Sequence, residues 1–261
     1  MKNNSAPRRH GVTEKRKRRM ALMPIPTVTL VSFLFLFSGC NHTPTGEVLT
    51  PKTTGTALVE SSGGKQVADV GNNLPQPVVV QVNGADGNAV TGALISFHGD
   101  GLTFTPDQAL SDSGGQVSVI VQVGTEPRNY TLVAETLKPD HSKATLELRE
   151  TALGYEQRVG KEVNDKYCVR CHDNESTALR VSNFDNLTPA PHNFSDGTYL
   201  NNLKDADLIG ITARGGPALG KAASMPPFGG TLDDKQIRAV IAYMRAIADP
   251  PYQTSGVKYG K

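Results

Sequence analysis

The stretch Tyr167-Cys168-Val169-Arg170-Cys171-His172 carries the clearest chemistry in the chain. Two cysteines three positions apart, with a histidine directly after the second, have the spacing at which both thiols bond to a haem and the imidazole ligates its iron. Only three Cys and six His occur among the 261 residues, so such a match is rare by chance. We therefore predict one covalently attached haem c, bound by Cys168 and Cys171, with His172 as an axial ligand.

Other uses of these cysteines lack the residues that they need. A structural zinc site has four ligands, usually from a second Cys or His pair, and the remaining histidines are solitary: His10, His42, His98, His141 and His192. A thioredoxin-like redox pair is expected beside a βαβ pattern, which the sequence does not contain. A metal site formed by His98, Asp100 and Asp112 is disfavoured, because each reads as a solvated turn residue.

The charge balance changes along the chain. Eight of the 27 Lys and Arg residues but one of the 25 Asp and Glu residues lie in residues 1–39, which leaves 19 basic and 24 acidic side chains, a net charge of −5, in the remainder. A mildly acidic protein of this kind does not indicate a nucleic-acid partner.

Residues 1–39 have the pattern of an export signal, with a basic start and an apolar run from Ile25 to Phe37. That run is short for a transmembrane span. It ends in Leu36-Phe37-Ser38-Gly39-Cys40, which resembles the lipobox of bacterial lipoproteins. The resemblance implies that 1–39 is a lipoprotein signal peptide and that Cys40 is lipidated, which anchors the protein to a membrane. An uncleaved signal anchor, or ordinary cleavage with a free Cys40, remains open.

Residues 40–64 are rich in Thr, Ser and Gly without an apolar period, which predicts a flexible linker. From 65 to 150 apolar residues alternate with polar ones, as in strands with one buried face. Turn signals separate five such runs: Val78–Val82, Ala93–Phe97, Val117–Val123, Tyr130–Ala134 and Leu146–Leu148. Short strands at this spacing favour a β-sandwich.

This part of the sequence resembles the bacterial immunoglobulin-like repeats of the invasin and intimin type. The likeness lies in LPQPVVVQVNGADGNAVTGALISF, GLTFTP and SDSGGQVSVIVQVGTEPRNYTLVAE. It implies an all-β immunoglobulin-like sandwich over residues 65–150 that acts as a spacer or interaction module without chemistry of its own.

Residues 155–249 resemble a class I c-type cytochrome domain, an all-α fold, and we expect this haem domain to occupy residues 151–249. Gly160 matches the glycine that lets the helix before the haem motif cross the C-terminal helix closely, while Asn164 stands where the family commonly has an aromatic. The segment Pro191-His192-Asn193-Phe194-Ser195-Asp196 is similar to the loop that follows in the family. We expect a carbonyl within residues 189–191 to accept a hydrogen bond from the imidazole of His172.

The loop Ser224-Met225-Pro226-Pro227-Phe228-Gly229-Gly230 supplies the second axial ligand, Met225, according to this resemblance. A thioether favours ferrous iron, so a His/Met pair raises the reduction potential. The alternatives are core packing of Met225, with His192 as a less favoured ligand. Met244 has the spacing of a core residue.

Two further helices are predicted. Asp205 has the character of an N-cap for a helix that runs to about Arg214 and ends at Gly215-Gly216. Asp233 and Gln236 form a capping-box pattern before an apolar stripe that includes Met244, with Tyr243 placed against the helix of Gly160. Asp249-Pro250 ends this helix, and 250–261 is expected to be a loose C-terminal tail.

These features predict a membrane-anchored c-type cytochrome that carries single electrons, without substrate turnover of its own. Two other functions remain open: a haem enzyme or a gas or peroxide sensor with a labile distal ligand, and an adhesive or docking protein acting through its immunoglobulin-like domain. We expect redox partner proteins in the bacterial cell envelope, attachment through the lipid anchor, and a position at the outer membrane facing the periplasm or the cell surface.

Overall fold

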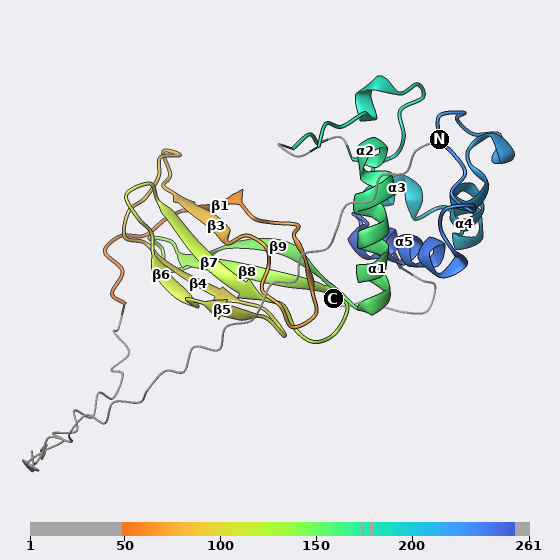
Figure 1. The fold of residues 1–261 in the computed structure, drawn as a ribbon. Helices are drawn as coiled ribbons and strands as arrows, with labels where there is room; N and C mark the ends of the chain where they lie inside the picture. The colour runs from red at the N-terminus through yellow and green to blue at the C-terminus, as the bar shows by residue number, and fades with distance from the viewer. Residues whose placement is uncertain (1–48, 174, 178–179, 254–261) are drawn as a thin grey trace, which may run out of the picture. The chain divides into compact units, whose positions relative to one another are not determined.

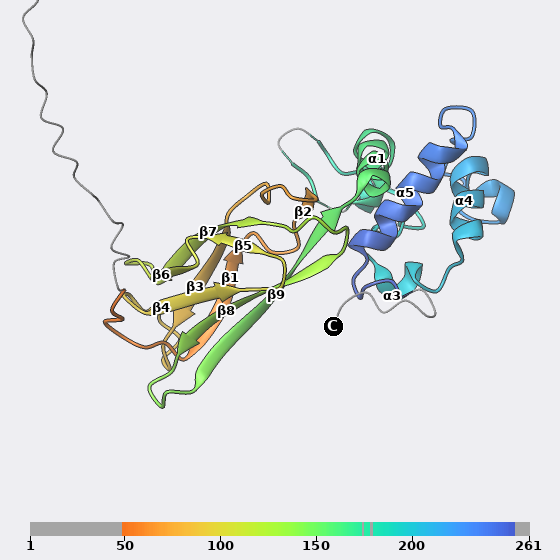
Figure 2. The same ribbon diagram turned by 90° about the horizontal axis from the view of Figure 1, so that it is seen from below.

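The computed structural model of the chain describes residues 49–173, 175–177 and 180–253 (Figure 1). The predicted signal peptide and Cys40 lie outside the described residues. Within them, strands occupy the N-terminal part and helices the C-terminal part, as both views show (Figures 1 and 2). None of the helices in this part of the chain is both long and apolar enough to cross a membrane.

The strands form two sheets. One sheet has the order β1-β3-β7-β5 and the other β2-β9-β8-β4-β6, and all pairs are antiparallel except the parallel pair of β2 and β9. The strands are β1 Ala57–Ser62, β2 Val67–Asp69, β3 Val78–Asn83, β4 Leu94–His98, β5 Thr103–Thr105, β6 Gln108–Leu110, β7 Gln116–Gln122, β8 Asn129–Leu137 and β9 Lys143–Leu153.

One apolar core joins the two sheets. Alternate residues of β3 and β7 are buried, and they pack in the same cluster as Ile95 of β4 and Leu132 of β8 from the other sheet. The predicted period-two alternation is therefore confirmed for these strands. Tyr130 is buried beside this core, and its hydroxyl donates to the carbonyl of Glu126 at 3.0 Å, which satisfies its polar end.

Two boundaries differ from those predicted. Residues 57–62, expected within the flexible linker 40–64, form β1, whose backbone pairs with β3. At the other end, β9 continues to Leu153 instead of ending at Glu150.

Glu150 is an unusual member of β9 because its side chain is fully buried. Its Oε2 accepts from the backbone N–H of Gln66 at 2.7 Å, whereas Oε1 has no hydrogen-bond partner within the described structure. Loss of solvent is the main cause that raises the pKa of this carboxyl to about 8, and the nearby Glu60 adds to it. Glu150 therefore favours the protonated form near neutral pH.

The C-terminal part contains five α-helices in the described chain, separated by turns and long loops. They are α1 Tyr155–Val163, α2 Val169–His172, α3 Gly197–Leu200, α4 Asp205–Arg214 and α5 Asp234–Ile247, with a π-helical turn at Asn164–Cys168 and 3₁₀ turns at Phe184–Asn186 and Pro217–Leu219. Helices α1 and α5 cross closely (Figures 1 and 2).

The predicted fold class must be corrected, because the described chain is mostly β and its C-terminal part is not simply all-α. Two sheets fill the N-terminal part, and between 155 and 247 helices alternate with irregular segments. The physical reason lies in the composition of residues 187–196 and 215–231. The first segment contains two Pro residues, and the second contains three Pro and five Gly residues. Neither residue type sustains a helix interior.

The start of α5 is as predicted, and the start of α4 is not. Asp233 caps α5 in a capping box: its Oδ1 accepts from the N–H of Gln236 at 2.8 Å, and Gln236 Oε1 accepts from the N–H of Asp233 at 3.1 Å. For α4 the N-cap is Lys204, without a side-chain capping bond, so the cap role assigned to Asp205 is wrong. Asp205 instead accepts from Arg245 at 2.9 and 3.0 Å.

Candidate cofactor site

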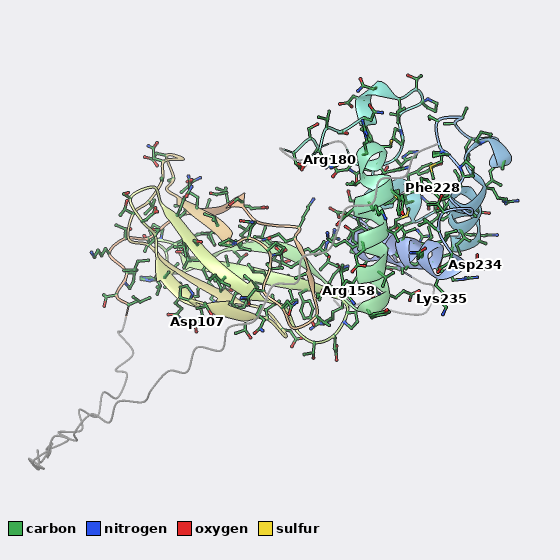
Figure 3. The ribbon with its side chains drawn as sticks, viewed as in Figure 1. Asp107, Arg158, Arg180, Phe228, Asp234 and Lys235 are labelled. Atoms are coloured by element: carbon green, nitrogen blue, oxygen red, sulfur yellow. The ribbon has the colours of Figure 1, made fainter. Side chains whose placement is uncertain are left out.

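A largely apolar cavity of about 360 Å³ lies within the helical part of the chain. Its volume is within the range of about 300–1,000 Å³ that is usual for small-molecule and cofactor sites. The described residues that line it include the four predicted haem-binding residues Cys168, Cys171, His172 and Met225. Phe228, labelled among the side chains of the helical part in Figure 3, also lines it.

The two cysteines come from the π-helical turn after α1 and from α2. The helix widens into a π-helical turn that ends at Cys168, and α2 then carries Cys171 and His172. Both thiols are free, and Cys168 is buried. Loss of solvent, followed by the proximity of Cys171, raises the pKa of Cys168 to about 12, so this group is a neutral thiol at physiological pH.

Gly160 sets how closely the helix before this motif approaches α5. A Cβ atom at Gly160 would overlap the carbonyl oxygen of Ala239 and would lie 2.8 Å from the Cβ of Tyr243. The expectation of a close crossing at Gly160, with Tyr243 against this helix, is therefore confirmed. The buried Asn164, at the position where the family commonly has an aromatic, begins the π-helical turn.

The imidazole of His172 has a defined tautomer. Its Nδ1 lies 2.8 Å from the carbonyl oxygen of His192. A carbonyl only accepts, so Nδ1 carries the proton and Nε2 keeps its lone pair for a metal. Loss of solvent lowers the pKa of His172, against the opposing effect of the His192 carbonyl, so the ring favours its neutral form. The predicted acceptor within residues 189–191 is thus corrected by one position.

Met225 is held by backbone bonds between its loop and the end of α4. The carbonyl of Met225 accepts from the N–H of Gly216 at 2.9 Å, and the N–H of Phe228 donates to the carbonyl of Thr212 at 3.0 Å. Gly215 adopts φ 78°, a conformation that favours glycine, and any Cβ there would lie 2.9 Å from the Met225 carbonyl. The Gly-Gly pair expected only to end α4 therefore also positions Met225.

The remaining candidate ligands have other surroundings. Met244 lines the cavity but is buried in the apolar cluster of the helical part. His192 also lines it, and its ring stacks on Tyr199. His98 contacts Glu135 at 3.2 Å and Asp100 contacts Arg128 at 2.8 Å. Nowhere among the described residues do three or more His, Cys, Asp or Glu side chains gather as a metal site.

Arg245 supports the wall of the cavity, and the sequence did not predict this role. Its guanidinium donates to the carbonyls of Leu200 and Leu203, each at 2.6 Å, as well as to Asp205. Both leucines line the cavity. An Arg in the last turn of a helix reads from sequence as a favourable charge at the C-terminus, which gives no sign of these long-range bonds.

The donor set at the cavity fits a haem. A neutral imidazole with Nε2 available and a thioether are both common axial ligands of haem iron, and two adjacent thiols of the Cys-x-x-Cys-His spacing suit covalent attachment. The apolar lining suits a large aromatic macrocycle, since burial of apolar surface stabilises its binding.

Comparison with known proteins identifies the helical part more clearly than the sandwich. Residues 156–244 match the family described as "Cytochrome C oxidase, cbb3-type, subunit III". No curated protein matches the chain.

Solved structures that resemble the chain have low similarity. They include the D0-D1 domain of intimin, at 14% identity over 39% of this chain and 49% of that one, with a TM-score of 0.28. An intimin C-terminal fragment in complex with the translocated intimin receptor matches at 16% identity, over 38% and 33% of the two chains, with the same score. The ZirS C-terminal domain matches at 17% identity, over 52% and 86%, again with a TM-score of 0.28. The chain thus spans half or less of the two intimin structures, and scores of this size carry no further argument.

The family match at residues 156–244 supports a c-type cytochrome domain with a haem cofactor in this part of the chain.

Proposed function

We propose that the protein is a membrane-anchored c-type cytochrome that carries single electrons in the bacterial cell envelope. One haem c would be bound through thioethers at Cys168 and Cys171, with His172 and Met225 as axial ligands. The observation that carries the proposal is that one apolar cavity is lined both by the segment of Cys168, Cys171 and His172 and by Met225, which is far away in the sequence.

The bound haem would supply one-electron exchange between ferric and ferrous iron. The residues around the haem would decide whether this exchange serves electron transfer or substrate turnover. His172 and Met225 would both hold the iron and so leave no position open for a substrate, which favours an electron carrier over an enzyme. The bond of His172 Nδ1 to the His192 carbonyl and the backbone bonds of the Met225 loop would limit reorganisation between the two oxidation states.

Replacement of Met225 tests the ligand assignment. Met225→Ala is expected to abolish the near-infrared sulfur-to-iron band of the oxidised protein and to lower its midpoint potential, because the soft ligand that favours ferrous iron is lost. Met244→Leu is the matched control, since it removes the other methionine of the cavity wall at similar side-chain volume. The band should survive in this variant.

Three outcomes would contradict the proposal. A near-infrared band that persists in Met225→Ala would remove Met225 from the site. A purified wild-type protein that stays colourless after expression with a haem-attachment apparatus would remove the haem. Rapid binding of carbon monoxide to the untouched ferrous protein would favour an enzyme or a gas or peroxide sensor, because it requires an open or labile axial position.

Membrane attachment is proposed from the lipobox resemblance at Cys40 alone, with the outer membrane as the expected site, facing the periplasm or the cell surface. Cys40→Ser is expected to move the protein from the membrane fraction to the soluble fraction after cell breakage. Retention of this variant in the membrane fraction would show that another segment anchors it. Protease treatment of whole cells that leaves the haem domain intact would argue against surface exposure.

A further inference from the structure

The loop 192–196 contacts His172 at three points. The carbonyl of His192 accepts from Nδ1 of His172 at 2.8 Å, and the N–H of Phe194 donates to the carbonyl of His172 at 3.3 Å. The rings of Phe194 and His172 lie 4.5 Å apart, centroid to centroid, at an angle of 37°. The orientation of the imidazole therefore depends on where this loop lies.

Side chains of the same loop and of α3 fix its position. The ring of His192 stacks on that of Tyr199, with centroids 3.5 Å apart and planes within 7°. Asp196 contacts both partners: Oδ2 lies 3.2 Å from Nδ1 of His192, and Oδ1 accepts from the N–H of Tyr199 at 3.2 Å. The stack thus joins the residue that supplies the carbonyl to a helix of the cavity wall.

Backbone hydrogen bonds to Asp249 also hold the C-terminal end of this loop. The N–H of Gly197 donates to the carbonyl of Asp249 at 3.1 Å, and the N–H of Asp249 donates to the carbonyl of Ser195 at 2.8 Å. A Cβ at Gly197 would collide with the carbonyl of Pro250. Tyr199 is therefore a fixed support against which the His192 ring is held.

We propose that Tyr199 and Asp196, acting through the His192 side chain, are positioning residues that fix the His192 carbonyl on the imidazole of His172 and so tune the iron. This inference deepens the proposed function and rests on it. The partner of a ligating imidazole's second nitrogen sets ring orientation and ligand basicity. A firmly held acceptor makes His172 a stronger donor, which favours ferric iron and lowers the midpoint potential.

The stack contributes more to this effect than the ionic contact does. The side chains of His192 and Asp196 are 46% and 36% exposed, so their interaction is weakened by solvent. A parallel aromatic contact does not depend on charge and is not screened by salt. Tyr199 is accordingly the position at which the proposal is best tested.

The test compares Tyr199→Leu with Tyr199→Phe in the full-length haem-loaded protein. Tyr199→Phe keeps the ring and removes only the hydroxyl, whereas Tyr199→Leu removes the stack. In Tyr199→Leu we expect the Nδ1–H proton of His172, followed by NMR in the ferrous state, to exchange with solvent faster, because its acceptor is no longer held in place. The expected factor is roughly tenfold, the lower end of what loss of a second-sphere partner costs in metal affinity or activity. The midpoint potential should rise, and a tenfold change in the one-electron equilibrium corresponds to 59 mV.

A matched pair of variants at His192 shows whether an effect of Tyr199→Leu comes only from a folding defect. His192→Phe keeps an aromatic ring on Tyr199 and loses the contact with Asp196, so it should shift both readouts by less than His192→Leu, which should resemble Tyr199→Leu. A role in stability alone would lower the unfolding midpoint of the leucine variants without moving proton exchange or potential, and that result would overturn the inference. Absence of haem from the wild type would instead refute the proposed function.

Discussion

Replacement of Gly160 by alanine tests the close crossing of α1 and α5 that places the haem-binding segment. The added Cβ would overlap the carbonyl oxygen of Ala239 and lie 2.8 Å from the Cβ of Tyr243. Neither neighbour can move away by a side-chain rotation, because one is backbone and the other is a Cβ atom. The two helices must therefore separate, which affects the packing of Val163 and Val240 in the cluster that they share.

The magnitude follows from two opposing effects. Overpacking of a well-packed interior typically costs about 1–3 kcal/mol, and an overlap with backbone belongs at the upper end of that range. Alanine in place of glycine within a helix gains back up to about 1 kcal/mol. The free energy of unfolding of the helical part should therefore fall by about 2 kcal/mol in Gly160→Ala.

Gly210→Ala is the matched control. Gly210 also lies within a helix, α4, but the nearest atom to an added Cβ is a terminal guanidinium nitrogen of Arg214, at 3.1 Å, which can move. We expect this variant to be stabilised by up to about 1 kcal/mol, because only the change in helix propensity remains. The same substitution thus has opposite signs at the two positions.

Urea unfolding followed by circular dichroism at 222 nm measures both variants, since the helices of the described chain all lie between Tyr155 and Ile247. At about 2 kcal/mol per M of urea, the midpoint of Gly160→Ala should fall by about 1 M. A midpoint at or above that of the wild type would refute the close crossing. A loss of equal size in Gly210→Ala would show that the effect does not come from the contact with α5.

Two further predictions concern a helix cap and a buried carboxyl. Asp233→Ala removes the side-chain acceptor of the capping box, which accepts from the N–H of Gln236, and should cost about 1 kcal/mol in urea unfolding, while Asp234→Ala, at an exposed position labelled in Figure 3, should cost less; equal losses would argue against the cap. Burial raises the pKa of Glu150 to about 8, so the unfolded chain releases this proton first, and stability should fall as pH rises from about 4.5 to about 8, by a few kcal/mol and at most roughly 5. Glu150→Gln should remove this part of the pH dependence, and an unchanged pH profile would contradict the raised pKa.

The sequence predicts the inner strands of the sandwich well because their side chains report burial directly. Val78, Val80 and Val82 alternate with less buried neighbours, as period two requires. β1 escapes prediction because it lies at a sheet edge, where among its six residues only Leu58 is buried. What stabilises β1 is the backbone ladder to β3, and backbone bonds leave no trace in residue type.

The candidate site likewise has residues that the sequence predicts and a contact that it does not predict. Cys168, Cys171 and His172 are predicted from a local spacing, and the structure places them at one cavity with Met225, more than fifty residues away in the sequence. The acceptor for His172 was expected within 189–191, but any residue has a carbonyl, so no sequence signal distinguishes His192 from its neighbours. The loop geometry alone makes that choice.

The two aspartates at helix starts show when a local signal fails. Asp233 and Asp205 have the same capping chemistry, yet only Asp233 accepts from the backbone of its own helix. Asp205 accepts two hydrogen bonds from Arg245, whose side chain is only 9% exposed. The same guanidinium also donates to two carbonyls of the cavity wall. Bonds from a guanidinium pair the carboxylate with a full positive charge, whereas a capping bond pairs it with a neutral backbone N–H. With Arg245 within reach, the carboxylate of Asp205 therefore binds the guanidinium, and α4 starts without a side-chain cap. A capping residue therefore predicts that a helix begins nearby, whereas the partner of its carboxylate depends on which cations the rest of the fold brings to it.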